Sequence, residues 1–410
     1  MSIIKIEKLN LGGIGKGPSD NGDIVEVPFS LPGDHIRIEE TNFGTTLLKS
    51  IIKNSPHRVT PICPQFGVCG GCSLQHGSDS FVTAWKRKII ENSLASRGLN
   101  IRVSEVFTSA QFSRRRAVFT GRRTKKKIIV GFNSRGTDTI VPLDGCVLLH
   151  HDIQEFFPAL EKITFLGTSR KGKIRIHVSL SNNGLDVLVQ ASKDLDEKAR
   201  AEIITLSKQY SISRFIWGNN LVVSLAPPVQ FFGKVEVIPP ALFFTQATVD
   251  GQNFMVNSAN EALTGSKNVL DLFCGIGTFS ASLCHKFRFL AVDHSKNMIE
   301  AIDVASKKSV GIKPIDTQVR NLYKNPILEN ELDKFDSVIL DPPRCGALEQ
   351  YKILARSGIA NIVAVSCNPV TFARDAEILV RRGFKVRWVK LIDQFRWSHH
   401  IEVIANFKKN

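Results

Sequence analysis

The C-terminal part of the chain, from residue 241 onward, alternates short, mostly apolar runs with longer stretches of mixed character. Short apolar runs between turn signals are typical of buried strands, and the longer stretches between them are typical of helices. Such an alternation predicts a doubly wound α/β sheet. The runs that carry this prediction are residues 269–272, 289–292, 337–340 and 361–365.

The N-terminal part has a different pattern, in which glycine and proline interrupt short strand-like runs. Residues 24–27 and 35–38 flank the turn-like sequence 31–34, and such spacing predicts a small β-barrel. The glycines within 12–17 do not predict a phosphate loop, because Pro18 and further turn residues follow in place of a helix.

The middle of the chain contains a cysteine-rich loop, a helix candidate at 81–97, a basic segment and strand-like runs such as 174–178. These changes of pattern divide the chain into a barrel-like region at 1–55, a central region at 56–235 and an α/β region at 236–410.

Composition and charge narrow the class of protein. The chain has 410 residues, of which 43% are hydrophobic, and it carries a formal net charge of +16. Such a surplus favours a polyanionic partner, because basic side chains that bind phosphates release counterions. We see no membrane-spanning run and no N-terminal leader, so we expect a cytoplasmic protein with no membrane partner. Nothing in the sequence predicts an obligate protein partner.

Basic residues gather at 114–116 and 122–127, and these segments border the apolar runs 117–119 and 128–130. Alternation of basic clusters with apolar runs predicts a basic hairpin or sheet face rather than an unfolded tail. We therefore expect this segment to contact nucleic acid, although a solvated charged surface is the alternative.

A glycine-containing turn at 271–280 follows the first strand of the α/β region. Glycines at a strand-to-helix turn let the backbone approach a ligand, and an acidic residue such as Asp293 at the end of the next strand can bind ribose hydroxyls. The third glycine of dinucleotide-binding enzymes is replaced by Ser280. This difference favours S-adenosylmethionine over NAD.

Two further motifs follow later strands of the α/β region: Asp341-Pro342-Pro343-Arg344, and the motif 366–369 that contains Cys367. Open α/β sheets bind ligands at the carboxyl ends of their strands, so Cys367 is a candidate nucleophile. Glu402 lies in an apolar run that would raise its pKa, which makes it a candidate general base. For Asp341 two roles are open: it contacts the substrate or the methyl donor, or it is a turn residue that caps a helix.

Three of the eight cysteines, Cys63, Cys69 and Cys72, lie within one glycine-rich loop, and Cys146 is a distant fourth. In a cytoplasmic protein such thiols favour metal binding over disulfides. Four thiolates hold an iron–sulfur cluster or a zinc ion, and their spacing does not choose between the two.

The order of these motifs resembles that of the bacterial RNA uridine-5-methyltransferase family, and above all its 23S ribosomal RNA enzymes that carry a cluster. The resemblance implies a TRAM domain, an OB-like RNA-binding barrel, at 1–55. It implies an RNA-binding central domain and a class I (Rossmann-like) methyltransferase domain at 236–410. It also implies a [4Fe-4S] cluster on the four cysteines Cys63, Cys69, Cys72 and Cys146. The donor pocket would contain Gln246, Phe273, Gly275, Thr278, Asp293, Asn321 and Asp341.

The family's reaction requires a nucleophile and a base, because carbon 5 of uracil does not attack a methyl donor unaided. The resemblance assigns these roles to Cys367 and Glu402. This sequence departs from the family pattern in three places: Thr248 stands where asparagine is usual, Asp293 where glutamate is frequent, and residues 396–398 replace a common Pro-His-Thr.

Three alternatives remain at this point. In the first alternative, the substrate is transfer RNA rather than 23S ribosomal RNA. In the second, the target base is cytosine, whose methyltransferases use two cysteines, and Cys345 would then be the second cysteine. The third alternative is an iron–sulfur RNA-binding protein without catalytic activity. A uridine-5-methyltransferase acting on 23S ribosomal RNA explains the most motifs.

Overall fold

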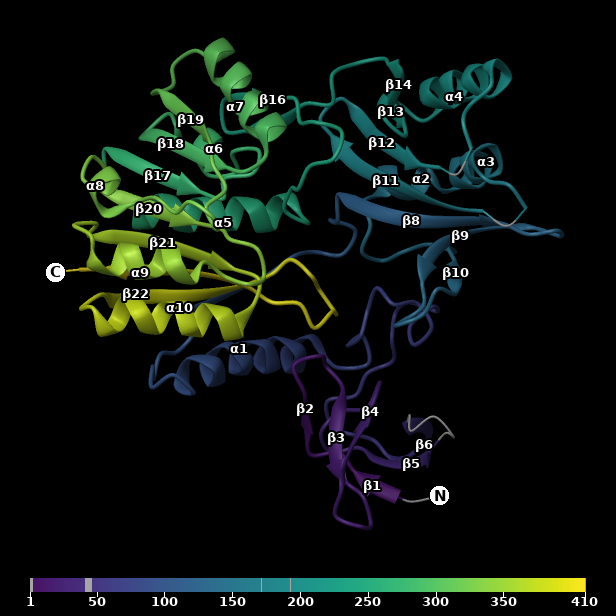
Figure 1. Cartoon of the computed structure of the whole chain (residues 1–410). Coiled ribbons are helices and arrows are strands. Elements are labelled where there is room, and N and C mark those ends of the chain that lie inside the picture. Colours follow the sequence, from purple (N-terminus) through teal and green to yellow (C-terminus); the bar gives the residue numbers. More distant parts are fainter. Residues whose placement is uncertain (1–2, 41–45, 171, 192, 410) are drawn as a thin grey trace.

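The structure is a computed structural model that describes residues 3–40, 46–170, 172–191 and 193–409. Figure 1 shows a small β region near the N-terminus, a sheet with helices in the middle of the chain, and a second sheet with helices that contains the C-terminus. The strands predicted at 269–272, 289–292, 337–340 and 361–365 are present and lie next to one another in this second sheet.

The N-terminal region consists of two small antiparallel sheets with strand orders β1-β5-β6 and β2-β3-β4. Ile4, Ile36 and Ile38 form part of its buried core. Gly17 lies where the strands approach closely, because a side chain there would meet the carbonyl oxygen of Lys5. The strands are β1 (Ile3–Lys5), β2 (Lys8–Leu9), β3 (Gly15–Pro18), β4 (Ile24–Val27), β5 (His35–Glu40) and β6 (Thr46–Lys53).

The central sheet has the order β10-β9-β8-β11-β12-β13-β14, in which only the β12–β13 pairing is parallel. Its core joins apolar strand positions to helices α2, α3 and α4. The elements are β8 (Arg116–Arg123), β9 (Ile128–Asn133), β10 (Ile140–Pro142), α2 (His151–Glu155), α3 (Phe157–Gly167), β11 (Lys173–Ser181), β12 (Gly184–Gln190), α4 (Glu197–Gln209), β13 (Ile212–Trp217) and β14 (Asn220–Ser224). A hairpin of β15 (Gln230–Phe232) and β16 (Val235–Val237) follows.

The C-terminal sheet has the order β19-β18-β17-β20-β21-β23-β22-β7. It is mixed, because β23 runs antiparallel to both of its neighbours. The strands are β17 (Asn268–Leu272), β18 (Arg288–Asp293), β19 (Ile315–Val319), β20 (Ser337–Leu340), β21 (Asn361–Ser366), β22 (Lys385–Asp393) and β23 (Glu402–Lys408). The helices between them are α5 (Val249–Ala262), α6 (Ser280–Leu283), α7 (Lys296–Lys308), α8 (Glu329–Leu332), α9 (Leu348–Arg356) and α10 (Pro369–Arg381).

The strands of this sheet contribute side chains to two hydrophobic cores, because successive side chains point to opposite faces of the sheet. In β21, Ile362 and Ala364 join the core that contains residues of α9 and α10, whereas Val363 and Val365 join the core that contains α5 and α7. The sequence order reverses around β17, which has β18 on one side and β20 on the other. A crevice for ligands is expected at the carboxyl ends of these strands.

Two elements that precede the central sheet in the sequence belong to the C-terminal sheet. Strand β7 (Glu105–Thr108) pairs in parallel with β22, and helix α1 (Asp79–Ala95) packs against α10 (Figure 1). Ile90 and Leu94 of α1 are fully buried in the same core as β21. The range 56–235 is therefore shared between two sheets, whereas the sequence predicted one central domain there.

Within the part of the chain that the structure describes, no helix combines the length and the apolar character that a membrane crossing requires.

Candidate active site

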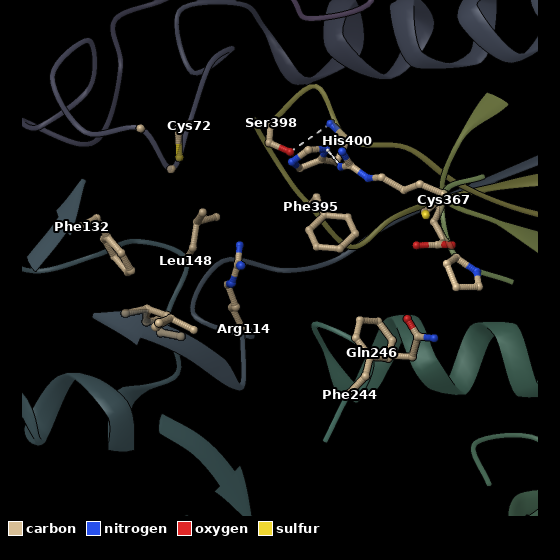
Figure 2. Close-up of a pocket in the computed structure, with 18 of the residues that line it drawn as sticks. Cys72, Arg114, Phe132, Leu148, Phe244, Gln246, Cys367, Phe395, Ser398 and His400 are labelled. Carbon is tan, nitrogen blue, oxygen red and sulfur yellow. Dashed lines mark hydrogen bonds between the residues drawn. The ribbon is translucent and has the colours of Figure 1, made fainter. Parts of the chain in front are cut away.

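A cavity of about 1020 Å³ opens between the central region and the C-terminal sheet. Figure 2 shows Cys72 at one end, Cys367 at the other, and Arg114, Phe395 and His400 between them. Every site residue predicted from the sequence lines this cavity, although the residues come from distant parts of the chain. They are Cys63, Cys69, Cys72, Cys146, Gln246, Phe273, Gly275, Thr278, Asp293, Asn321, Asp341, Cys367 and Glu402.

The turn after β17 exposes backbone to the cavity. Phe273 and Gly275 have positive φ angles of 61° and 58°, and open space surrounds the position that a side chain of Gly275 would occupy. The Gly275 N–H donates to one carboxylate oxygen of Asp293 (3.1 Å), and the Ser295 N–H donates to the other (2.9 Å). These bonds fix the Asp293 carboxylate at the end of β18, where it can accept further hydrogen bonds from a ribose.

Asn321 orders the part of the cavity wall next to the glycine turn, and we call this part, with Phe273, Gly275 and Asp293, the donor end. The side-chain oxygen of Asn321 accepts the N–H groups of Tyr323 (3.1 Å) and Lys324 (3.2 Å), which orders the loop after β19. The Tyr323 ring lies 5.4 Å from that of Phe273. The two rings form an apolar surface beside the glycine turn, suited to a flat ligand group.

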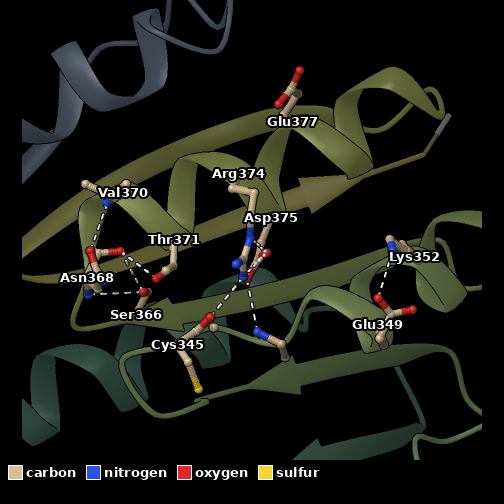
Figure 3. Close-up of polar contacts among 12 residues, drawn as sticks. Cys345, Glu349, Lys352, Ser366, Asn368, Val370, Thr371, Arg374, Asp375 and Glu377 are labelled. Carbon is tan, nitrogen blue, oxygen red and sulfur yellow. Dashed lines mark hydrogen bonds and ion pairs between the residues drawn. The ribbon is translucent and has the colours of Figure 1, made fainter. Parts of the chain in front are cut away.

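Cys367 is held by the turn between β21 and α10. The Asn368 side chain accepts the Val370 N–H (3.1 Å) and so caps α10, whose first residue is Pro369. The same side chain donates to the Arg344 carbonyl (3.0 Å), which ties this turn to the loop after β20. Figure 3 shows the hydrogen bonds among Ser366, Asn368 and Thr371 that complete the turn. The Ser-Cys-Asn-Pro sequence therefore presents a thiol at a rigid strand end.

Glu402 begins β23 and is 5% exposed. The Gln394 amide nitrogen donates to Glu402 (3.3 Å) and to the Gln246 side-chain oxygen (2.7 Å), while the Gln394 oxygen accepts the Ala247 N–H (2.8 Å). Gln246 in turn donates to Asp341 across 3.4 Å. Two buried amides therefore link the carboxyl groups of Glu402 and Asp341.

Burial and mutual repulsion determine the protonation of these groups. Burial, followed by the charge of Asp341, raises the pKa of Glu402 to about 8. Burial, followed by the charge of Asp271, raises the pKa of Asp341 to about 7. Burial, and then Glu402 and Asp341, raises the pKa of Cys367 to about 11, although Arg344 opposes the shift. A positive charge inside the cavity would lower all three pKa values.

The four thiols of the cysteine end interact electrostatically with one another. Burial is the main cause that raises the pKa of Cys72 to about 12, and the other three thiols raise it further. The Gly71 N–H donates to the Cys69 sulfur (3.4 Å). Among the described residues, no three histidine, cysteine or acidic side chains converge closely enough to hold a single metal ion.

Two of the departures noted in the sequence now have local explanations. The Thr248 side chain caps α5 by accepting the Gly251 N–H (3.2 Å). It therefore stabilises the start of this helix and does not line the cavity. Trp397 has a φ of 58°, and its carbonyl accepts the N–H groups of Ser73 and Leu74 (2.9 Å each). The loop before Glu402 is thereby attached to the chain just after Cys72.

The sequence did not indicate the role of Gln394. Gln394 follows β22 with no local motif, and its position becomes meaningful only through contacts with Gln246 and Ala247. Cys345 is exposed and lies outside the cavity lining, where it interacts with the Tyr323 hydroxyl (3.0 Å).

The fold and the donor end together indicate the class of domain to which the C-terminal sheet belongs. A mostly parallel sheet whose order reverses at β17, with a glycine turn and an acidic residue at adjacent strand ends, is typical of a Rossmann-like methyltransferase domain.

Comparison with known proteins identifies the family. Residues 240–409 match the family described as tRNA (Uracil-5-)-methyltransferase. An uncharacterized RNA methyltransferase of Rhizobium meliloti is 36% identical over 99% of both chains. A 23S rRNA (uracil(1939)-C(5))-methyltransferase of Shewanella amazonensis is 28% identical over 99% of this chain and 95% of its own. The chain belongs to the RNA uridine-5-methyltransferase family, a family of transferases that use S-adenosylmethionine.

A solved structure agrees with this fold. The crystal structure of Pyrococcus abyssi tRNA (uracil-54, C5)-methyltransferase, determined with S-adenosyl-L-homocysteine, superposes with a TM-score of 0.73. The match covers 98% of this chain and 99% of the other at 22% identity. The predicted Rossmann-like methyltransferase fold is thus confirmed.

Proposed function

We propose that the protein methylates carbon 5 of one uridine in 23S ribosomal RNA, with S-adenosylmethionine as the methyl donor. The observation that carries the proposal is the presence of Cys367 and Glu402 in the same cavity as the glycine turn and Asp293. The similarity to the Shewanella enzyme along nearly the whole chain supports ribosomal RNA as the substrate.

Cys367 would act as the nucleophile. Its thiolate adds to carbon 6 of the uracil, which turns the ring into an enolate whose carbon 5 attacks the methyl group. The C–S bond of the donor breaks and S-adenosylhomocysteine leaves. The free thiol has a raised pKa, so the positive sulfonium of the bound donor would favour the thiolate.

Glu402 would act as the general base in the second half of the reaction. It removes the proton from carbon 5, and the bond between carbon 6 and Cys367 then breaks. Its raised pKa suits proton removal near neutral pH. The hydrogen bond from Gln394 orients the carboxylate and keeps the pKa from rising further.

The remaining residues of the donor end would hold S-adenosylmethionine. Asp293 is positioned for the ribose hydroxyls, and the Gly275 backbone for close approach of the ligand. Phe273 would pack against the donor. We assign the rest of this pocket to Gln246, Thr278, Asn321 and Asp341.

We propose a [4Fe-4S] cluster on Cys63, Cys69, Cys72 and Cys146. The donor set fits: four thiols share one end of the cavity, and the N–H groups of Leu148 and Leu149 donate to Cys146. Four thiolates could also hold one zinc ion, and the family resemblance is what favours the cluster. When bound, the cluster would brace two loops far apart in sequence.

The barrel at 1–55 would be a TRAM-like domain that contacts RNA, and 56–235 and 236–410 would be the central and methyltransferase domains, with α1 and β7 contributed to the latter. Transfer RNA remains the alternative substrate, because the matched family and the Pyrococcus enzyme are named for it. The position of Cys345 outside the cavity lining counts against cytosine as the target. The intact pair of Cys367 and Glu402 counts against a non-catalytic RNA-binding protein.

The test is to map 5-methyluridine by mass spectrometry in ribosomal and transfer RNA from a strain that lacks the gene. We expect one uridine of 23S ribosomal RNA to lose its methyl group and the purified protein to restore it. Loss confined to transfer RNA would favour the alternative substrate. Unchanged 5-methyluridine in both, with 5-methylcytidine lost, would reject the proposal.

A further inference from the structure

Three arginines gather near the cavity: Arg114 and Arg116 are partly buried, and Arg344 is exposed. None of the three has a carboxylate within ion-pair distance among the described residues. Several sheltered cations elsewhere do have such partners, whereas the buried Arg115 bonds to the neutral side chains of Thr245 and Gln252. The pairs are Arg58 with Asp34, Lys86 with Asp393, Arg214 with Asp186, Arg320 with Glu331, and Arg396 with Asp79.

Two of these arginines, Arg116 at the start of β8 and Arg114 just before it, are partly withdrawn from water. Burial lowers the pKa of Arg116 to about 10 and also lowers that of Arg114. The Nε atom of Arg116 is buried without a hydrogen-bond partner, and its guanidinium lies 4.5 Å from the centre of the Phe244 ring. A desolvated charge without a partner costs free energy, and an anion that binds there recovers this cost.

Arg344 approaches the same region from the loop after β20. Its Nη2 atom lies 2.8 Å from Nδ1 of His400. Burial, together with His399, Arg344 and Arg114, lowers the pKa of His400 to about 4, so the ring is neutral and accepts this hydrogen bond. Arg344 and Arg116 also both lower the pKa of Glu402. Arg114 and Arg344 therefore line the same cavity as His400 and Glu402, and Arg116 lines a smaller pocket that shares Arg114 with it.

We propose that Arg114, Arg116 and Arg344 bind the backbone phosphates on either side of the target nucleotide, an assignment that rests on the proposed function. A guanidinium matches the oxygens of a phosphodiester with two parallel hydrogen bonds. A base that leaves its stack to enter the cavity brings its flanking phosphates to the rim. Arg114 also faces Cys72 and Cys146, so Arg116 and Arg344 are the better probes.

The experiment measures the binding of a single-stranded oligouridylate to the enzyme saturated with S-adenosylhomocysteine, at several salt concentrations. We expect Arg116→Gln and Arg344→Gln each to reduce the slope of log affinity against log salt by about 0.7, because one fewer phosphate is neutralised. Affinity at low salt should fall about tenfold. Arg344→Lys keeps the charge and should keep most of the slope.

The matched control is Arg356→Gln on α9, an arginine that is paired with Glu329 and lies outside the cavity lining. It should change neither slope nor affinity. An unchanged slope in Arg116→Gln and Arg344→Gln would overturn the phosphate site. So would a matching loss of S-adenosylhomocysteine affinity in calorimetry, since the arginines would then bind the carboxylate of the donor. Methyl transfer to RNA by the unaltered enzyme is measured separately, so failure of the proposed function is distinguishable.

Discussion

The two ends of the cavity present sulfur in different ways. At one end, Cys367 and Glu402 stand at strand termini, and hydrogen bonds through Asn368 and Gln394 fix their surroundings. At the other end, the four predicted cluster cysteines lie on loops, and backbone N–H groups donate to the sulfurs of Cys69 and Cys146. The sheet therefore defines the geometry around Cys367 and Glu402, whereas the geometry of the cysteine end would depend on the cluster proposed there.

The thiol pKa values at the two ends of the cavity are raised for different reasons. The Cys367 pKa is raised by burial and then by two carboxylates, and that of Cys72 by burial and then, in part, by the other thiols. A bound cationic donor would lower the pKa of Cys367, and bound iron would lower that of Cys72. Substitutions at the two ends should accordingly affect chemistry at one and folding at the other.

The largest expected effect on chemistry is that of Cys367→Ala. Without a thiolate to add to the ring, methyl transfer should fall by at least about 10³-fold, while RNA binding and the melting temperature stay close to those of the unaltered protein. Transfer of labelled methyl groups to RNA measures the effect. Cys345→Ala is the matched control and should remain active. If Cys345→Ala were the inactive variant, the nucleophile would be misassigned.

Glu402→Gln should separate the two halves of the reaction. The adduct with RNA forms, but removal of the carbon-5 proton slows by about 10²- to 10⁴-fold, which is the usual contribution of a general base. A covalent protein–RNA band on denaturing gels should therefore accumulate. Turnover at the normal rate without such a band would contradict the assignment.

Cys72→Ser tests the other end of the comparison. We expect loss of iron, which should otherwise be about four atoms per chain, and a melting temperature several degrees lower, because metal binding contributes to folding. Metal analysis and thermal unfolding measure both quantities, with Cys345→Ser as the control. Full iron content in Cys72→Ser would remove this thiol from the cluster.

A smaller effect is expected from Gln394→Met, which keeps the volume of the side chain but removes its hydrogen bonds. Because Gln394 lowers the pKa of Glu402, the pH profile of methyl transfer should shift to higher pH, and the rate at pH 7 should fall about tenfold per pKa unit. Gln350→Met is the matched control, since Gln350 is buried and bonds to the Ile327 backbone. A rate loss without a shifted profile would indicate a merely structural role.

The smallest effect concerns stability. The folded protein retains the Glu402 proton up to a pKa of about 8, whereas the unfolded chain releases it near the ordinary glutamate pKa of 4.5. Folding therefore loses stability as pH rises between these two values. Glu402→Gln, which has no charge to lose, should melt a few degrees higher at pH 8 and at nearly the same temperature at pH 4.5. Equal melting curves at pH 8 would contradict the raised pKa.

The sequence predicted which residues meet at the Cys367 end of the cavity, because they occur in short motifs after apolar strands. The strand ends that carry Asp293, Asp341 and Cys367 follow from local pattern and from the rule that parallel strands meet ligands at their carboxyl ends. Gln394 has no such local signal. Its role arises from contacts across the chain, such as that with Ala247, which no local pattern encodes.

The pairing of β7 with β22 has a practical consequence for protein engineering. Because Glu105–Thr108 and Asp79–Ala95 complete the C-terminal sheet and its core, a fragment that starts at residue 236 would expose the edge of β22 and the apolar face of α10. Bare sheet edges promote aggregation. The catalytic module is thus discontinuous along the polypeptide, and a soluble minimal version would have to retain residues 79–108, by fusion or by co-expression.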